Sequence, residues 1–64
     1  MFASAEYAPL MTSRAAAMCD VGRWDEGRDL AIRARDLQAS EEVVNLLGRI
    51  DRYFVAQHTT AFNR

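Results

Sequence analysis

Apolar and polar residues follow one another along this chain with the period of an α-helix rather than with the strict alternation of a β-strand. Three segments carry the helical pattern: residues 9–21, 25–38 and 40–57. Gly22 and the Ala39-Ser40 pair interrupt the pattern between them, and residues 58–64 show no period and are expected to fray. The sequence therefore predicts an all-α fold of three helices in one small domain, residues 1–64.

Residues that suit helix ends lie close to these predicted boundaries. Pro9 fits the first turn of the first helix, where its missing N–H costs nothing, although Thr12 or Ser13 would suit as the cap of a shorter helix. Asp25 is the expected cap of the second helix, and Ser40 is that of the third. Acidic residues follow both caps, where the helix dipole favours negative charge.

The second predicted helix carries a single apolar stripe. At about 100° per residue, its apolar and small side chains fall within an arc of about 140°. They are Trp24, Gly27, Leu30, Ala31, Ala34 and Leu37. Charged residues cluster on the opposite side: Asp25, Glu26, Asp29, Arg33 and Asp36. We expect the stripe to pack on the first helix and the charged side to face water.

The third predicted helix is apolar over about 200°, whereas one packing contact needs somewhat more than about 100°. The residues on this arc are Val43, Val44, Leu46, Leu47, Ile50, Tyr53, Phe54 and Val55. The surplus predicts a second surface, covered by another protein. Its anchors would be Leu46, Ile50, Tyr53 and Phe54, with Val43 and Val44 at its edge. The alternative is that these residues form the core of the domain itself.

The order of glycine, aromatic and small residues from Gly22 to Leu37 resembles the second half of a tetratricopeptide repeat. The matching positions are Gly22, Trp24, Gly27 and Ala34, whereas Ala31 is small where the family has a large residue and Ala39 replaces its usual proline. In the preceding helix, Met11, Ala15 and Met18 occupy the bulky and small positions of the pattern, and Arg14 stands where leucine is usual.

This resemblance covers about residues 8–54 and implies an antiparallel helical hairpin followed by the first helix of a next unit. Gly27 and Ala34 would let the two hairpin helices approach closely. At least about three repeats are normally needed to bury a continuous core, so the third helix would stand at an open end of the stack. The resemblance also implies a second docking site, a groove on the inner face of the first helix, with Thr12, Ala16 and Cys19.

The chain is too small for a large core, and its composition offers no cross-link in compensation. A domain of 64 residues buries only about 60% of the surface that its unfolded chain exposes. Cys19 is the only cysteine and His58 the only histidine, so one chain can form neither a disulfide nor a tetrahedral metal site. Association with another chain is the remaining source of stability, and self-association into a homo-oligomer is favoured.

Catalysis has little support in the sequence. The only nucleophile and base are Cys19 and His58, which lie on different segments, and the acidic cluster of the second helix belongs to its solvated side. No glycine-rich phosphate loop occurs. We therefore expect a protein that is not an enzyme, with no catalytic residue, no cofactor and no metal.

The charge pattern argues against a nucleic-acid partner. The net charge is -1, and most of the arginines have an acidic residue close by in the sequence, whereas DNA binding requires a basic stripe. A helix-turn-helix DNA binder that uses Arg28, Arg33 and Arg35 is the least favoured alternative. No stretch approaches the roughly twenty apolar residues that span a bilayer, so we expect no membrane partner. The lone cysteine and the absence of a signal-peptide pattern in the first ten residues predict a cytoplasmic location.

The function predicted from the sequence is that of a non-catalytic protein-protein interaction module, similar to a minimal tetratricopeptide unit, which associates through its third helix. The partner would be a second copy or a larger protein. The competing possibility is a small regulator or inhibitor that uses the same face to occupy a site on a larger enzyme or complex.

Overall fold

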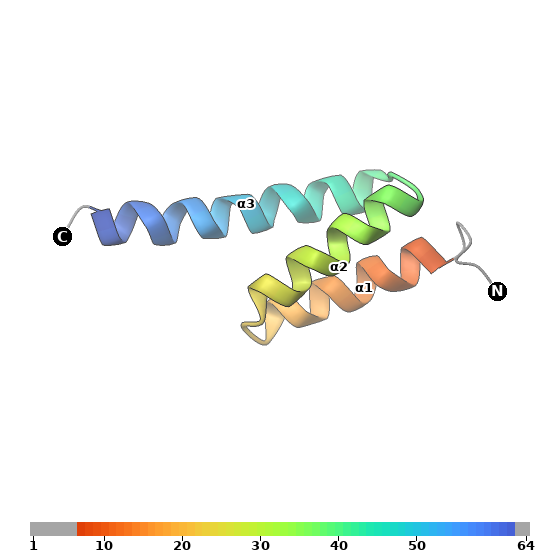
Figure 1. The fold of residues 1–64 in the computed structure, drawn as a ribbon, viewed down its shortest axis with the longest axis horizontal. Coiled ribbons are helices and arrows are strands. Elements are labelled where there is room, and N and C mark those ends of the chain that lie inside the picture. Colours follow the sequence, from red (N-terminus) through yellow and green to blue (C-terminus); the bar gives the residue numbers. More distant parts are fainter. Residues whose placement is uncertain (1–6, 63–64) are drawn as a thin grey trace.

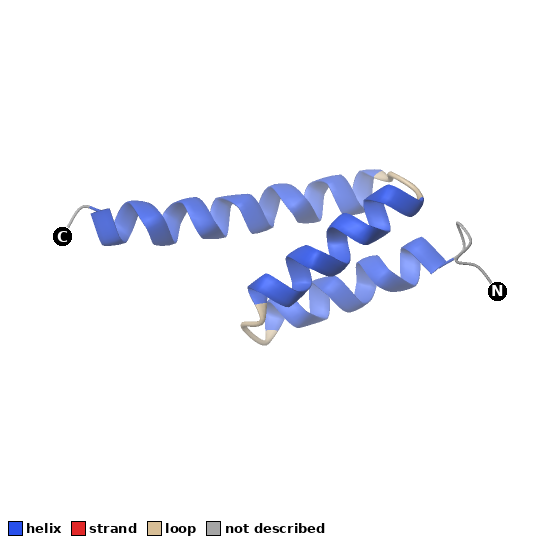
Figure 2. Cartoon of the chain, in the orientation of Figure 1, coloured by secondary structure: helices blue, strands red, loops and turns tan. Residues whose placement is uncertain are grey.

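The computed structural model describes residues 7–62, with the side chains of residues 7–58. Over that range the chain forms three α-helices joined by short turns and contains no strand, as Figure 2 shows. The helices are α1 (Tyr7–Asp20), α2 (Trp24–Leu37) and α3 (Glu41–Phe62). Figure 1 shows α1 and α2 as an antiparallel hairpin, with α3 along one side of it. The predicted all-α class is confirmed.

Helix α1 begins at Tyr7, two residues before the predicted start. Pro9 therefore lies inside the first turn, where helical N–H groups have no intrahelical acceptor and a proline is tolerated. The Thr12 hydroxyl donates a hydrogen bond to the carbonyl oxygen of Ala8 at 2.9 Å. Because Thr12 bonds back into a helix already formed, the shorter helix capped at Thr12 or Ser13 is wrong.

The turn between α1 and α2 depends on Gly22, whose φ of 90° lies in the left-handed region that favours glycine. The Arg23 N–H bonds to the Met18 carbonyl at 2.8 Å, and the Gly22 N–H bonds to that of Cys19 at 3.0 Å. This pair of bonds is a Schellman motif, which satisfies the last carbonyls of α1.

Helix α2 follows this turn at once and begins at Trp24, one residue before the predicted start. Arg23 is its N-cap and makes no side-chain capping bond. The expectation that Asp25 caps α2 is therefore wrong. Asp25 and Glu26 lie instead in the first helical turn, where their charge still suits the helix dipole.

Helix α3 contains 22 residues and continues to Phe62, whereas the sequence predicted an end at Gln57 and a frayed tail. No glycine or proline interrupts residues 58–62, so nothing in the local sequence stops the helix. Residues 63–64 of the predicted tail lie outside the described residues. The predicted cap is confirmed, since the Val43 N–H donates to the Ser40 hydroxyl oxygen at 3.2 Å.

Small residues form the contact between α1 and α2. The buried members of this contact are Ala15, Cys19, Gly27, Ala31 and Ala34. A Cβ atom placed on Gly27 would lie 2.7 Å from the Cys19 sulfur and 2.9 Å from the Ala15 carbonyl oxygen. Gly27 is therefore needed for the spacing of the hairpin, and the predicted close approach of its two helices is confirmed.

The large side chains of the core come from α3 instead. Ile50 and Val43 are the largest fully buried side chains, and Leu46 is buried beside them. They pack with the small residues of the hairpin in one cluster. Each buried aliphatic side chain of this size contributes about 1.5–3 kcal/mol, so α3 supplies much of the hydrophobic stabilisation that the hairpin lacks.

Candidate interaction surface

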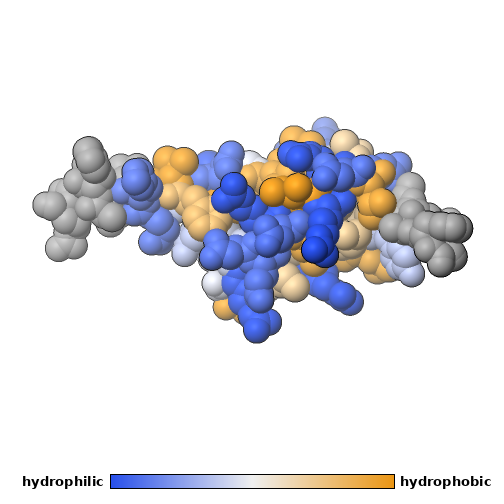
Figure 3. Space-filling view, viewed as in Figure 1, coloured by the Kyte–Doolittle hydropathy of each residue, from blue (hydrophilic) through white to orange (hydrophobic). Residues whose placement is uncertain are grey.

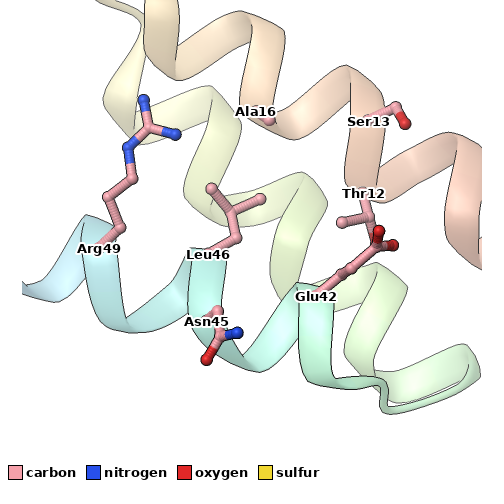
Figure 4. Close-up of a pocket in the computed structure, with 7 residues that line it drawn as sticks. All are labelled: Thr12, Ser13, Ala16, Glu42, Asn45, Leu46 and Arg49. Carbon is pink, nitrogen blue, oxygen red and sulfur yellow. The ribbon is translucent and has the colours of Figure 1, made fainter.

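A groove of about 390 Å³ lies between α1 and α3, and Figure 4 shows the side chains that line it. They are Thr12, Ser13 and Ala16 from α1, and Glu42, Asn45, Leu46 and Arg49 from α3. Leu46 and Thr12 are buried at its base, whereas Ser13, Glu42, Asn45 and Arg49 are exposed around it. An apolar base inside a polar rim is the usual composition of a protein docking site.

Arg49 closes one end of this groove and is held there by two contacts. Its Nη2 donates to Oδ1 of Asp20 at 2.7 Å, in an ion pair that links α3 to the last residue of α1. Its guanidinium carbon lies 5.5 Å from the centre of the Trp24 ring, within cation–π range. In Figure 4 the side chain extends toward the C-terminal end of α1. These contacts give this end of the groove a defined shape.

The second docking site predicted from the sequence corresponds in part to this groove. Thr12 and Ala16 line it, but Cys19 does not. Cys19 is only 2% exposed and lies against Gly27 inside the hairpin. Burial raises the pKa of the Cys19 thiol, while Arg49 lowers this pKa and Asp20 raises it. Cys19 is thus a packing residue of the hairpin, out of reach of a docked partner.

The polar side of the groove was not predicted from the sequence. Glu42, Asn45 and Arg49 recur at intervals of three and four residues, which places them on one side of α3. This spacing is visible in the sequence, but the predicted surface of the third helix included only its apolar residues. The three side chains are exposed at the groove that the hairpin creates.

The six partner-binding residues predicted on the third helix divide into two groups. Val43, Leu46 and Ile50 are 0%, 6% and 1% exposed, so they belong to the core of this chain. Their predicted place on a free surface is wrong: the fully buried residues of the hairpin contact are small, and these large side chains of α3 cover them. Tyr53 and Phe54 are half-buried, and Val44 is 53% exposed.

Tyr53 and Phe54 form an aromatic cluster with Trp24. The rings of Trp24 and Tyr53 are stacked, with centroids 4.1 Å apart and planes at 5°, and Phe54 meets Tyr53 edge-on at 5.2 Å. The guanidinium carbon of Arg28 lies 5.6 Å from the centre of the Phe54 ring. The two predicted aromatic anchors are therefore engaged with α2.

Several apolar side chains remain exposed, and Figure 3 shows hydrophobic atoms interrupting the hydrophilic surface along the C-terminal half of α3. Val44 and Val55 on α3 are 53% and 63% exposed, and Val21, in the turn between α1 and α2, is 72% exposed. Tyr7 and Leu10 border a smaller hollow of about 130 Å³ at the start of α1. The sequence did not predict this hollow, which also needs Leu30 of α2 beside Met11 and Arg14 of α1.

The acidic side chains of the described residues are scattered over the surface rather than gathered in one cluster. The described residues contain no group of three or more histidine, cysteine, aspartate or glutamate side chains that could hold a metal ion. Asp25, Glu26 and Asp29 are exposed along α2, as predicted for a solvated side. None of the helices in the described range is long and apolar enough to cross a membrane.

Two exposed surfaces of the described residues involve α3: the groove between α1 and α3, and the side of α3 that carries Val44 and Val55. Comparison of the chain with protein-family models, with curated proteins and with solved structures gave no match.

Proposed function

We propose that this chain is a non-catalytic protein-protein interaction module in which α3 supplies the docking surface. One observation carries the proposal: α3 packs on the hairpin along one side only and exposes Val44 and Val55 on another. With 22 residues it is also eight residues longer than each hairpin helix, about 12 Å at 1.5 Å per residue. In Figure 1 its C-terminal end extends past the hairpin.

The groove between α1 and α3 supports the same proposal, because the N-terminal half of α3 forms one wall of it, with Leu46 at the base and Glu42, Asn45 and Arg49 at the rim. The close approach at Gly27 supports the resemblance to a tetratricopeptide hairpin, with α3 in the position of a following helix. In this proposal the protein acts in the cytoplasm, where the unpaired thiol of Cys19 stays reduced.

Photo-crosslinking in the cells that produce the chain tests this function. The photoreactive residue p-benzoylphenylalanine would replace Val55 on α3, or Arg33 on the charged side of α2 as a control. We expect a discrete adduct from position 55 and none from position 33. The adduct should disappear when Val44→Asp is added, because the charge disrupts the same apolar surface without entering the core.

The identity of the adduct separates the alternatives. An adduct with a second copy indicates a homo-oligomer, and an adduct with a larger enzyme or complex indicates the small regulator. The proposal fails if position 55 gives no adduct beyond that of position 33, or if Val44→Asp leaves the adduct unchanged.

A further inference from the structure

The side of α3 that points away from the hairpin has an unusual composition for a solvent-facing side. At about 100° per residue, five residues with described side chains fall on an arc of about 80° opposite Val43, Leu46 and Ile50 and form what we call the outward face. They are Glu41, Val44, Gly48, Arg52 and Val55. Two of the five are valines, 53% and 63% exposed. A helix side that only meets water is normally polar, so the outward face is suited to a partner.

Gly48 is the central residue of the outward face, and nothing within the described chain requires it to be glycine. A Cβ atom at Gly48 would meet only Nη1 of Arg52, at 3.8 Å, which is ordinary contact. Gly27 provides the comparison, since a Cβ there would collide with Cys19 and Ala15. Glycine inside a helix is unfavourable relative to alanine. The packing of Gly27 explains its presence, whereas Gly48 lacks such a reason within one chain.

Charge and spacing indicate which partner fits. Glu41 lies at the N-terminal end of the outward face and Arg52 lies near its C-terminal end, before Val55, and neither forms an ion pair with any described residue. If two α3 helices pack antiparallel with Val44 of each copy over Gly48 of the other, Arg52 of each copy comes beside Glu41 of the other. Both charged residues lie on the same edge of the outward face, which is the edge that an antiparallel pair brings together.

We propose that a second copy of this chain docks on the outward face of α3, with the two α3 helices antiparallel and Val44 of each packed over Gly48 of the other. Two symmetric Glu41–Arg52 pairs fix the register. Such an isologous contact needs only one complementary patch per chain. The two hairpins then lie on opposite sides of the helix pair and do not collide. This inference rests on the proposed function, because it names the partner of the same helix.

Molar mass measured over a concentration series tests the second copy directly. One chain has a mass of 7.2 kDa, and we expect the mass from sedimentation equilibrium to rise toward twice that value with concentration. Gly48→Ala should raise the thermal stability of the dilute monomer and weaken the dimer several-fold. The methyl group favours the helix but occupies the place of closest approach.

Charge reversal tests the antiparallel register. Glu41→Arg alone and Arg52→Glu alone each create two like-charge contacts, and each should weaken the homodimer about tenfold. An equimolar mixture of the two variants restores both opposite-charge contacts, so the mixed dimer should bind about as tightly as the native one. Native mass spectrometry distinguishes the mixed dimer by mass, and circular dichroism checks that each variant is folded.

A mass that stays at 7.2 kDa at millimolar concentration would overturn the second copy. If position 55 still crosslinks to a different protein in that case, the proposed function stands and only this inference fails. The antiparallel outward-face contact would be overturned by a different result. In that result, the mixed dimer of Glu41→Arg with Arg52→Glu binds no more tightly than the homodimer of either variant. Should a charge variant fail to fold, Gly48→Leu replaces it: its Cβ would meet only the Arg52 side chain within one chain, and the larger side chain at the point of closest approach should abolish the dimer.

Discussion

The ring of Tyr53 lies flat against the indole of Trp24, with centroids 4.1 Å apart and ring planes at 5°. This stack joins the first residue of α2 to the middle of α3. The sequence predicted that Trp24 packs on the first helix, and Trp24 does border the core cluster. Its ring contact with Tyr53, however, attaches α3 to the hairpin beyond Ile50, the last buried residue among the described side chains.

Replacing Tyr53 should show how much the stack contributes. Tyr53→Leu keeps apolar bulk but removes the ring, and we expect the free energy of unfolding to fall by about 0.5–1.5 kcal/mol. Tyr53→Phe keeps the stack and should stay within about 0.5 kcal/mol of the native chain. Urea unfolding followed by circular dichroism measures both variants. Equal stability of the two variants would mean that the stacked geometry adds nothing beyond apolar burial.

Gly27 and Gly48 should respond in opposite directions to the same substitution. Gly27→Ala places a methyl group 2.7 Å from the Cys19 sulfur, and overpacking of this kind costs about 1–3 kcal/mol. Gly48→Ala meets no obstacle in one chain and should stabilise the dilute monomer by about 0.5–1 kcal/mol. Thermal unfolding at low micromolar concentration compares the two. A stabilising Gly27→Ala would show that the hairpin helices can separate without loss.

Ser40 should be sensitive to loss of its hydroxyl group. Ser40→Ala removes the acceptor of the Val43 N–H bond, and the loss of such a cap costs about 0.5–2 kcal/mol. Ser40→Asn supplies another capping oxygen and should recover most of that stability. Urea unfolding of the three chains tests the role of the cap. If alanine and asparagine behave alike, the bond does not contribute to the start of α3.

Cys19 should report on opening of the hairpin. Its side chain is 2% exposed, and burial raises the pKa of its thiol. A thiol reagent should therefore react slowly with the native chain and at the rate of a free cysteine in urea, because the thiolate is the reactive form. A native rate equal to the unfolded rate would contradict this close packing.

The same shift in pKa predicts how stability depends on pH. The folded chain holds the Cys19 proton more tightly than the unfolded chain, in which the thiol has a pKa of about 8.5. This stabilisation is fully present below the unfolded pKa and is lost as the pH rises toward and through the folded pKa. Cys19→Ala should remove that part of the dependence, which urea unfolding between neutral and alkaline pH would measure.

Local features of the sequence were enough to predict three helices and the close contact between α1 and α2, although not the end of α3 at Phe62. The break at Gly22 and the cap at Ser40 depend on neighbours within a few positions, and the small size of Gly27 and Ala34 can be read from the sequence alone. The groove was predicted only in part. Thr12 and Ala16 belong to it, but the polar residues of α3 that complete it come from another helix.

The sequence by itself determined that this chain forms helices, where the turns fall, and that α1 and α2 can approach closely, because helix periodicity, turn formation and residue size act locally. Only the tertiary structure decided which part of the wide apolar arc of α3 faces inward. Val43, Leu46 and Ile50 became core, whereas Val44 and Val55 stayed exposed. The physical reason is that a wide apolar arc fits several helix orientations equally well, and the shape of the small-residue hairpin selects one of them.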